Sequence, residues 1–571
     1  MPLLISKNNF LGSKNIGSYF VNTSKFKLYK ENYLFHLCGE IFSHTIEEVI
    51  NLIIYNAEVK FDKIIGDFSI ILFDKKTDKL SILNDRAGRN LIYYSTKRDF
   101  SVSDDFWSIV KHDEYTVDDV DLLTFKTQIF FSASPDNKTI LCGLNIVPNA
   151  VIAVYINNSF SIKKYWHFNL KKNKLTKEQK YDEIDRLLSA SFKTIKELNP
   201  ENTVYGIGVS GGLDSRIIPH YALKHGMKLK SFIVGQEKPH RFWKSNDHIS
   251  SDSIVDHFKL EHQKLEYNEL SYIDKLELEV LYAPSVASQM FKIPNIDKID
   301  FDVLLTGASG FYVGSSPFYS KIRKLDLIEM VCVQQADLNL KRKFYKIKKG
   351  LNYIFGKWFN TNPIVVKSIE GIINESDVIQ IHNNIKKYFS EMKNLNKTEK
   401  LMNYAVSILG QKNKSGSFES LLNHKKNYTP YMPFLIDAVE YWNEDDIYDR
   451  KLFENFIKER LPELSSIKAQ NHKTALDVDN PNLINKLLSL ALFVIRGTGV
   501  MNYPRWSKGK EFKKFVNEYF NMDVYVSSYF DIEKIKKLTY QDKIDSSVIT
   551  GIIKLNEIIK RINKNGIYND K

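Results

Sequence analysis

The sequence predicts a two-domain α/β protein, in which an antiparallel β-rich domain precedes a doubly wound parallel sheet with a helical C-terminal extension. Three observations lead to this prediction. As far as about residue 168, short apolar or alternating runs are separated by turn-forming residues, a pattern typical of antiparallel strands. After residue 169 the apolar period lengthens to that of a helix, and helices then alternate with buried strands. From about Leu325 onward, helical patterns dominate.

The first predicted domain, residues 1–168, contains five recognisable strands and one helix. The helix is expected at Thr45–Asn56, because Thr45 can cap its N-terminus and Glu48 follows three residues later, as in a capping box. The strands are expected at Leu34–Cys38, Phe68–Phe73, Leu80–Leu83, Leu91–Tyr94 and Val151–Tyr155.

The second predicted domain, residues 169–571, opens with a polar stretch from Asn169 to Lys177. Helices and strands alternate after it, which is the arrangement that gives a parallel sheet with helices on its faces. The elements are expected at Tyr181–Leu198 (helix), Thr203–Val209 (strand), Asp214–His225 (helix), Leu229–Val234 (strand) and Phe301–Leu305 (strand).

The composition of the chain indicates which classes of binding partner are favoured. The net charge of +13 is compatible with nucleic-acid binding, but the lysines are scattered among Asn and Ile, which favours a solvated surface. The three cysteines, Cys38, Cys142 and Cys332, form no CxxC pair, so neither a zinc knuckle nor a disulfide framework is indicated. No signal peptide and no apolar run of membrane length is recognisable, so we expect a cytoplasmic protein without a membrane partner.

The segment Ser210–Ser215, with the sequence SGGLDS, is the strongest candidate for chemistry. It lies between a predicted strand and a predicted helix, so that Gly211 and Gly212 let the backbone approach a polyanion at a helix N-terminus. The hydroxyls of Ser210 and Ser215 can add donors, and Asp214 would face phosphate through a Mg²⁺ ion. The pattern is not a Walker loop, which requires GxxxxGK[ST].

The SGGxDS pattern resembles the signature of ATP-pyrophosphatases, and the rest of the chain resembles the asparagine synthetase family. The similar segments follow in the family's order and cover about Leu34 to Pro462. They are Cys38–Phe42, Gly66–Asp74, Asp85–Tyr94, Tyr165–Trp166, Phe232–Gly235, Leu305–Gly307 and Tyr431–Asp437.

This resemblance implies a fold and an activity. The first domain would be an αββα sandwich of the N-terminal nucleophile (Ntn) hydrolase type, and the second an ATP-pyrophosphatase domain. The chain would use ATP and Mg²⁺ to adenylate a small-molecule or peptide carboxylate, release pyrophosphate, and transfer the acyl group to ammonia or an amine.

The resemblance also assigns roles to residues. Ser210, Gly211, Gly212 and Ser215 would hold pyrophosphate, and Asp214 would bind Mg²⁺. The strand ends at Val234-Gly235 and Thr306-Gly307 would line the AMP site. Arg450 or Lys451 corresponds to a lysine that faces the pyrophosphate or the intermediate.

Four positions depart from the family pattern. The family's glutaminase uses an N-terminal cysteine, but residue 2 is Pro2, and Cys38 replaces an oxyanion-hole Asn. We therefore expect no glutaminase activity, as in the cysteine-lacking β-lactam synthetases and lasso-peptide cyclases. In the second domain, Phe311 stands where a second Mg²⁺-binding Asp is expected, and Thr429 replaces a Glu.

Two rival functions stay open at this point. The losses at Phe311 and Thr429 are compatible with a pseudoenzyme that binds nucleotide or a protein partner. A thiolation enzyme acting on nucleic acid would fit the loop and the charge, but no cysteine lies near the loop, so a nucleic-acid partner is disfavoured. A homodimer is left open.

Overall fold

The computed structural model describes most of the chain. It covers residues 3–8, 13–22, 25–131, 133–172, 174–235, 245–266, 270–288, 295–307, 323, 327, 369, 371–409, 426–467, 509–522, 524–542, 544 and 546–564. The predictions made for Pro2, for Phe311 and for Cys332 lie outside these residues.

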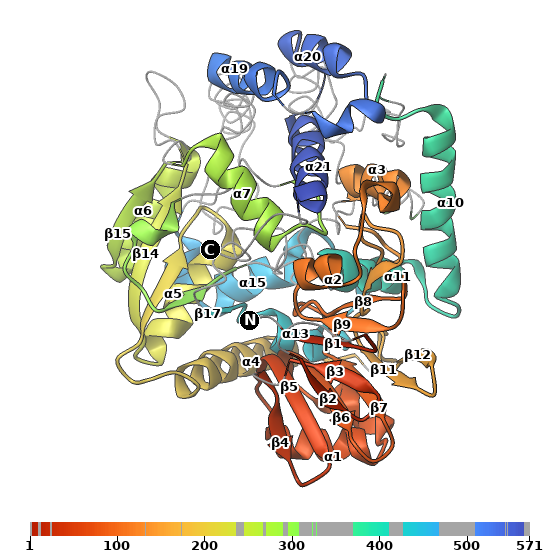
Figure 1. The fold of residues 1–571 in the computed structure, drawn as a ribbon. Helices are drawn as coiled ribbons and strands as arrows, with labels where there is room; N and C mark the ends of the chain where they lie inside the picture. Colours follow the sequence, from red (N-terminus) through yellow and green to blue (C-terminus); the bar gives the residue numbers. More distant parts are fainter. Residues whose placement is uncertain are drawn as a thin grey trace.

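Two antiparallel six-stranded sheets form the N-terminal half (Figure 1). The first has the order β10-β8-β9-β1-β3-β2, with β1 (Leu4–Ser6), β2 (Lys14–Ile16), β3 (Tyr19–Val21), β8 (Tyr93–Ser95), β9 (Ser101–Ser103) and β10 (Leu144–Ile146). The second has the order β12-β11-β7-β6-β5-β4, with β4 (Lys27–Tyr29), β5 (Tyr33–Ile41), β6 (Gly66–Asp74), β7 (Lys79–Asn84), β11 (Val151–Ile156) and β12 (Ser159–Lys164).

The two sheets pack face to face, and helices cover their outer faces. Strand β6 explains the layering, because its successive side chains point to opposite faces. Ile71 and Phe73 join the core between the sheets, whereas Phe68, Ile70 and Leu72 pack under α1 (Ile46–Ile54). Helices α2 (Phe106–His112) and α3 (Leu122–Phe131) belong to the core on the other side. This is the predicted αββα order, and the capping box of Thr45 and Glu48 on α1 is confirmed.

A parallel five-stranded sheet, of order β15-β14-β13-β16-β17, forms the centre of the second half. Its strands are β13 (Val204–Gly208), β14 (Lys228–Val234), β15 (Glu261–Leu265), β16 (Val303–Leu305) and β17 (Lys426–Tyr428). The accompanying helices are α4 (Lys177–Glu197), α5 (Leu213–Lys224), α6 (Asn246–Phe258) and α7 (Tyr272–Tyr282). The predicted α/β class with antiparallel and parallel sheets is therefore confirmed.

Several elements differ from the sequence prediction. In the sandwich, β1 to β4, β9, β10 and β12 and the helices α2 and α3 were not expected, and β8 begins at Tyr93 instead of Leu91. Helix α4 begins at Lys177, four positions before the expected Tyr181, because Thr176 and Gln179 form a capping box at its start. The two edge strands β15 and β17 were not predicted. Strand β15 is mostly exposed, as expected of an edge strand, and it therefore lacks the continuous apolar run of a central strand.

The remaining helices follow β16. They are α10 (Glu375–Glu391), α11 (Lys397–Tyr404), α13 (Met432–Val439), α14 (Glu444–Ile447), α15 (Lys451–Arg460), α16 (Pro462–Ser465), α19 (Lys510–Tyr519), α20 (Ile532–Tyr540) and α21 (Ser546–Lys564). Helix α21 packs against both α3 and α7 (Figure 1), so Ile549 and Ile552 share one core with Phe125 and Ile129. The C-terminal extension thus joins the N-terminal sandwich to the second half.

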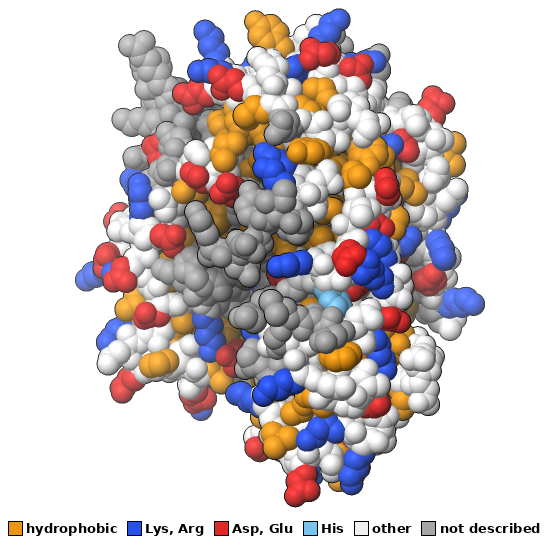
Figure 2. All heavy atoms as spheres, viewed as in Figure 1, with side chains coloured by type: hydrophobic (Ala, Val, Ile, Leu, Met, Phe, Trp, Pro, Cys, Tyr) orange, Lys and Arg blue, Asp and Glu red, His pale blue; other side chains and the backbone are white. Residues whose placement is uncertain are grey.

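The surface agrees with the scattered pattern of lysines in the sequence. On the face drawn in Figure 2, basic and acidic side chains are interspersed over the described residues. In the described part of the chain, no helix combines the length and the apolar character needed to cross a bilayer.

A buried turn after β7 joins the two halves. The carboxylate of Asp85 accepts hydrogen bonds from the backbone amides of Phe68 (2.9 Å), Ala87 (2.6 Å) and Gly88 (3.0 Å). Gly88 is required here, since its φ is +62° and a Cβ would lie 2.8 Å from the Cβ of Asn149.

The turn projects two arginines into the second half. Arg86 pairs with Asp437 (2.5 Å) and donates to the carbonyl of Pro433 (3.1 Å), both on α13. Arg89, which is 2% exposed, pairs with Asp67 (3.3 Å) and donates to the hydroxyl of Thr429.

Arg86→Met tests this junction. The substitution keeps much of the buried volume but removes the charged hydrogen bonds to α13, so we expect a loss of about 2 kcal/mol in the free energy of unfolding. Urea unfolding followed by tryptophan fluorescence measures it. The control is Arg98→Met, which removes a surface pair with Glu114 and should change stability by less than about 0.5 kcal/mol. Equal effects of the two substitutions would contradict the assigned role of Arg86.

Candidate functional site

The SGGLDS loop lies at the carboxyl edge of the parallel sheet. It connects β13 to α5, and Thr306-Gly307 follows the neighbouring strand β16. After β13 the chain moves to β14 on one side, and it later returns to β16 on the other side. The order of the strands therefore reverses between β13 and β16, which is where open α/β sheets bind ligands. The loop residues and Thr306-Gly307 meet at this point.

The loop is held by its two serines. The Ser215 hydroxyl donates a hydrogen bond to the carbonyl of Ser210 (2.8 Å) and accepts one from the amide of Ser210 (3.2 Å). The Ser210 hydroxyl accepts the amide of Gly212 (3.3 Å) and lies 3.1 Å from the Ser215 hydroxyl. In this structure the hydroxyls predicted to contact phosphate therefore shape the loop.

Asp214 is a carboxylate enclosed by other segments. Its side chain is 20% exposed, and Oδ1 is buried with no hydrogen-bond partner among the described residues. Burial raises the pKa of Asp214 above its ordinary value, and the nearby Arg450 guanidinium opposes that shift. The backbone carbonyl of Asp214 accepts a hydrogen bond from the Tyr431 hydroxyl at 2.5 Å. Gly307 packs closely against Asp214, since a Cβ at position 307 would lie 3.2 Å from the Cβ of Asp214.

Of the two predicted basic residues, Arg450 is the one that pairs with the carboxylate of Asp214. Its Nη1 lies 4.0 Å from Oδ2 of Asp214, and its backbone is left-handed (φ 60°, ψ 18°) immediately before α15. A non-glycine residue in that region is uncommon and is often associated with a functional site. Lys451 is the first residue of α15 and is exposed.

The two predicted strand ends are fixed by backbone hydrogen bonds. The amide of Gly235 donates to the carbonyl of Leu265 on β15 (2.8 Å), and Gly235 has a φ of +127°. The amide of Thr306 donates to the carbonyl of Tyr428 on β17 (3.0 Å). Both segments thus terminate strands of the sheet that carries the loop.

Asp247 and Arg216 also border the loop. Asp247 is buried and accepts the amide of Gly211 (3.3 Å), whereas Asp252 pairs with Lys264 at 3.6 Å. Arg216 was missed, although it follows the motif directly.

Arg216 ties the loop to the helices that follow. Its guanidinium is fully buried and donates to the carbonyls of Leu464 (3.0 Å), Ile467 (2.9 Å) and Gly211 (3.4 Å). Burial lowers the pKa of Arg216 to about 10. The one sequence feature that could have identified Arg216 is the presence of an arginine in the predicted helix, next to the glycine-rich loop.

Thr429, which departs from the family pattern, and Glu40, which lies in the similar segment Cys38–Phe42, both make contacts between the halves. Thr429 is buried, and its hydroxyl receives the hydrogen bond from Arg89. Glu40 pairs with Lys426 of β17 at 2.6 Å, which agrees with a structural role for this carboxylate. Nearby, the rings of Phe42 and Phe434 stack at 5.3 Å.

Comparison with known proteins identifies one family. Residues 40–166 match the glutamine amidotransferase domain. No curated protein matches the chain. The family match covers the sandwich only from the end of β5 to β12, and it does not extend to the parallel sheet.

Several solved structures are similar to parts of the chain. Glutamine phosphoribosylpyrophosphate amidotransferase from B. subtilis is 10% identical over 38% of this chain and 50% of its own, with a TM-score of 0.17. NH3-dependent NAD synthetase from Campylobacter jejuni is 11% identical over 39% and 98%, with a TM-score of 0.17. A tRNA thiolase from Methanococcus maripaludis is 12% identical over 45% and 85%, with a TM-score of 0.18.

These structural matches are partial. The chain spans about half the length of the amidotransferase and of an allosteric regulatory enzyme of purine biosynthesis that it also matches. TM-scores this low mean that the alignments do not extend to a shared overall fold, so no conclusion about activity rests on them.

Arg216→Lys tests the support of the loop. A lysine ammonium cannot reproduce the planar set of donors, so at least one buried carbonyl loses its partner and we expect a loss of about 2 kcal/mol in stability. Thermal unfolding measured by circular dichroism reports the change. The matched control is Arg186→Lys, on the exposed face of α4, where Arg186 pairs with Glu183 of the same helix. An unchanged melting temperature in Arg216→Lys would show that its hydrogen bonds do not support the loop.

Proposed function

We propose that the chain is an ATP-dependent amide ligase related in architecture to asparagine synthetase. It would adenylate a carboxylate, release pyrophosphate, and transfer the acyl group to ammonia or an amine. The observation that carries the proposal is the position of the SGGLDS loop at the strand-order reversal, beside Asp214, Arg450 and Gly307. The amidotransferase match at residues 40–166 supports it, because that domain type accompanies amide-forming enzymes.

ATP would lie across the carboxyl edge of the sheet. The backbone of Gly211 and Gly212 and the N-terminus of α5 would hold the phosphates, since free helix amides attract anions. Thr306, Gly307, Val234 and Gly235 would line the AMP part. A phosphate oxygen would take the amide of Gly211 from the Asp247 carboxylate.

The loop residues fit a Mg²⁺ ion. Oδ1 of Asp214 is a buried carboxylate oxygen without a partner among the described residues, and Asp247 supplies a second carboxylate at the same loop. Asp214, together with Asp247, would hold the ion, which would neutralise charge on the leaving pyrophosphate. Arg450 would add positive charge on the same side of Asp214, which stabilises negative charge as it develops.

A nucleotide-binding protein without turnover is the second candidate. One observation favours it: the hydroxyl of Thr429, which stands where the family pattern has an acid, is engaged by Arg89. The site would then keep a single family-type carboxylate, Asp214, and bind Mg-ATP without completing adenylation. Release of AMP and pyrophosphate in the presence of candidate acids separates the two functions.

Asp214→Asn tests the nucleotide site. We expect calorimetry with Mg-ATP to show micromolar binding to the unaltered chain and at least about tenfold weaker binding to the variant, since loss of one metal-linked carboxylate costs at least about 1.4 kcal/mol. Asp252→Asn is the matched control, because that carboxylate, on α6, pairs with Lys264 on β15. Absence of binding to the unaltered chain rejects both the ligase and the nucleotide-binding candidate.

We expect no glutaminase activity from the N-terminal half. Pro2 offers no thiol or hydroxyl for attack on an amide, and the thiol of Cys38 lies against His36 and Asp104. Incubation of the purified chain with glutamine should therefore release no glutamate above a protein-free blank. Release that exceeds the blank and co-elutes with the chain would overturn this expectation, and ammonia would then not need an external source.

A further inference from the structure

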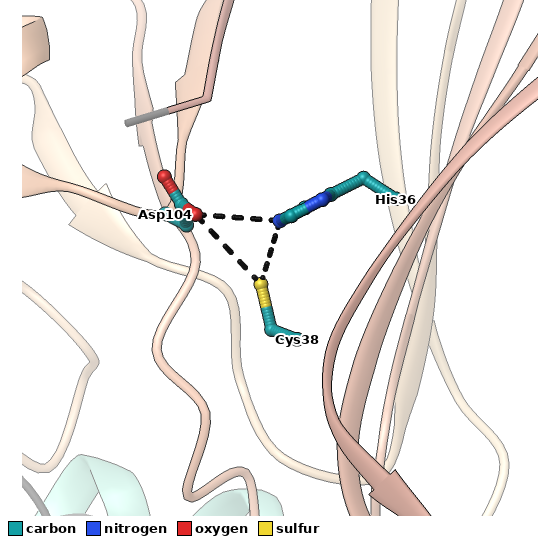
Figure 3. A group of neighbouring side chains, drawn as sticks. All are labelled: His36, Cys38 and Asp104. Carbon is teal, nitrogen blue, oxygen red and sulfur yellow. Dashed lines mark hydrogen bonds and ion pairs between the residues drawn. The ribbon is translucent and has the colours of Figure 1, made fainter. Parts of the chain in front are cut away.

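Three side chains of metal-ligating type converge between the two sheets of the sandwich. His36 and Cys38 are two positions apart on β5, so they project from the same face of that strand. Asp104 follows β9 of the opposite sheet. Figure 3 shows the imidazole, the thiol and the carboxylate pointing toward one another. The family pattern has an oxyanion-hole Asn at position 38, and neither that pattern nor the proposed ligase function assigns a role to His36, Cys38 and Asp104 as a group.

The separations of the three atoms suit one metal ion. Nε2 of His36 lies 3.0 Å from Sγ of Cys38 and 3.3 Å from Oδ2 of Asp104, and Sγ lies 4.0 Å from Oδ2. A tetrahedral zinc ion with bonds of about 2.0–2.3 Å places its ligand atoms about 3.3–3.8 Å apart. The observed triangle therefore needs changes of about half an ångström in its edges.

The outer contacts orient the ligands. Nδ1 of His36 lies 3.3 Å from the backbone carbonyl of Lys25, which accepts a hydrogen bond only if Nδ1 carries the proton. This tautomer leaves the Nε2 lone pair facing the sulfur and the carboxylate. The other carboxylate oxygen, Oδ1 of Asp104, is fixed by the amide of Leu3 at 2.8 Å. Such outer contacts are typical of histidine and carboxylate ligands.

A cation is already attracted to this point. The ammonium of Lys25 lies 3.2 Å from Oδ2 of Asp104, and its side chain is 39% exposed, so it can move into solvent. With Nδ1 protonated, the thiol proton of Cys38 can be shared with only one of its two neighbours, Nε2 of His36 or Oδ2 of Asp104, whereas a divalent cation contacts all three atoms.

We propose that His36, Cys38 and Asp104 bind one borderline-soft divalent cation of the Zn²⁺ class. Thiolate and imidazole select such a cation over Mg²⁺, which prefers oxygen ligands. The three residues supply three ligands, and a fourth position is left for water or another donor, as in open zinc sites. Binding releases the thiol proton of Cys38 and displaces the Lys25 ammonium.

Titration of the chelator-treated chain with Co²⁺ under a phosphine reductant tests the site. We expect one Co²⁺ per chain, a thiolate-to-cobalt charge-transfer band in the near ultraviolet, and loss of that band when Zn²⁺ is added. Cys38→Ser should remove the band and weaken binding by at least about tenfold. Cys142→Ser is the matched control, because Cys142 is an exposed thiol outside the cluster, and it should keep both.

Two further variants separate a metal site from a fold defect. Asp104→Asn keeps the shape of the side chain, and we expect its melting temperature to be insensitive to Zn²⁺ while that of the unaltered chain rises. Lys25→Ala removes the competing ammonium and should strengthen Co²⁺ binding. The proposal is overturned if the unaltered chain shows no thiolate–cobalt band, or if Cys38→Ser and Cys142→Ser bind Co²⁺ alike.

Discussion

The hydrogen bonds of the buried Asp85 carboxylate support the rest of the molecule. By accepting backbone amides from its own turn and from β6, Asp85 fixes the direction in which Arg86 leaves the sandwich. Arg86 then holds α13, and α13 begins directly after Tyr431, whose hydroxyl contacts the backbone of Asp214. A continuous series of polar contacts thus connects the sandwich to the SGGLDS loop. Because such networks are closely packed, a change in one contact strains the neighbouring ones.

Local patterns in the sequence predicted the α/β class and the loop, whereas the αββα order of the first part was implied by the resemblance to the asparagine synthetase family. Strand β6 carries an apolar run that only a strand buried on both faces explains, and SGGLDS is contiguous. The residues around the loop were harder to predict. Tyr431 is 217 positions from Asp214 and Arg450 still further, so only the folded chain brings them together. Asp247 could be named as an acid but not placed.

The cluster at His36 shows the same limit in the first domain. His36 and Cys38 share a face of β5 and could have been paired from their spacing, but Asp104 is 68 positions from His36 on the opposite sheet. A search for CxxC pairs does not find these three candidate ligands, because they come from two sheets that meet only by face-to-face packing. The edge strand β17 was missed for a related reason: its position depends on pairing with β16 and on the Lys426 contact to Glu40.

The contact between Arg89 and Thr429 joins the sandwich to the segment after β17, at a position where the asparagine synthetase pattern has an acid. Arg89 is buried and already paired with Asp67, so the hydroxyl of Thr429 offers it a neutral acceptor without a second charge. A glutamate at position 429 would compete with Asp67 for the same guanidinium and would bring an additional buried charge. Thr429 also lies between β17 and Tyr431, whose hydroxyl contacts the backbone of Asp214. The contact between Arg89 and Thr429 therefore belongs to the same junction that positions Asp214. The sandwich therefore supports, through Arg89 and Thr429, the segment whose Tyr431 contacts Asp214 in the candidate nucleotide site.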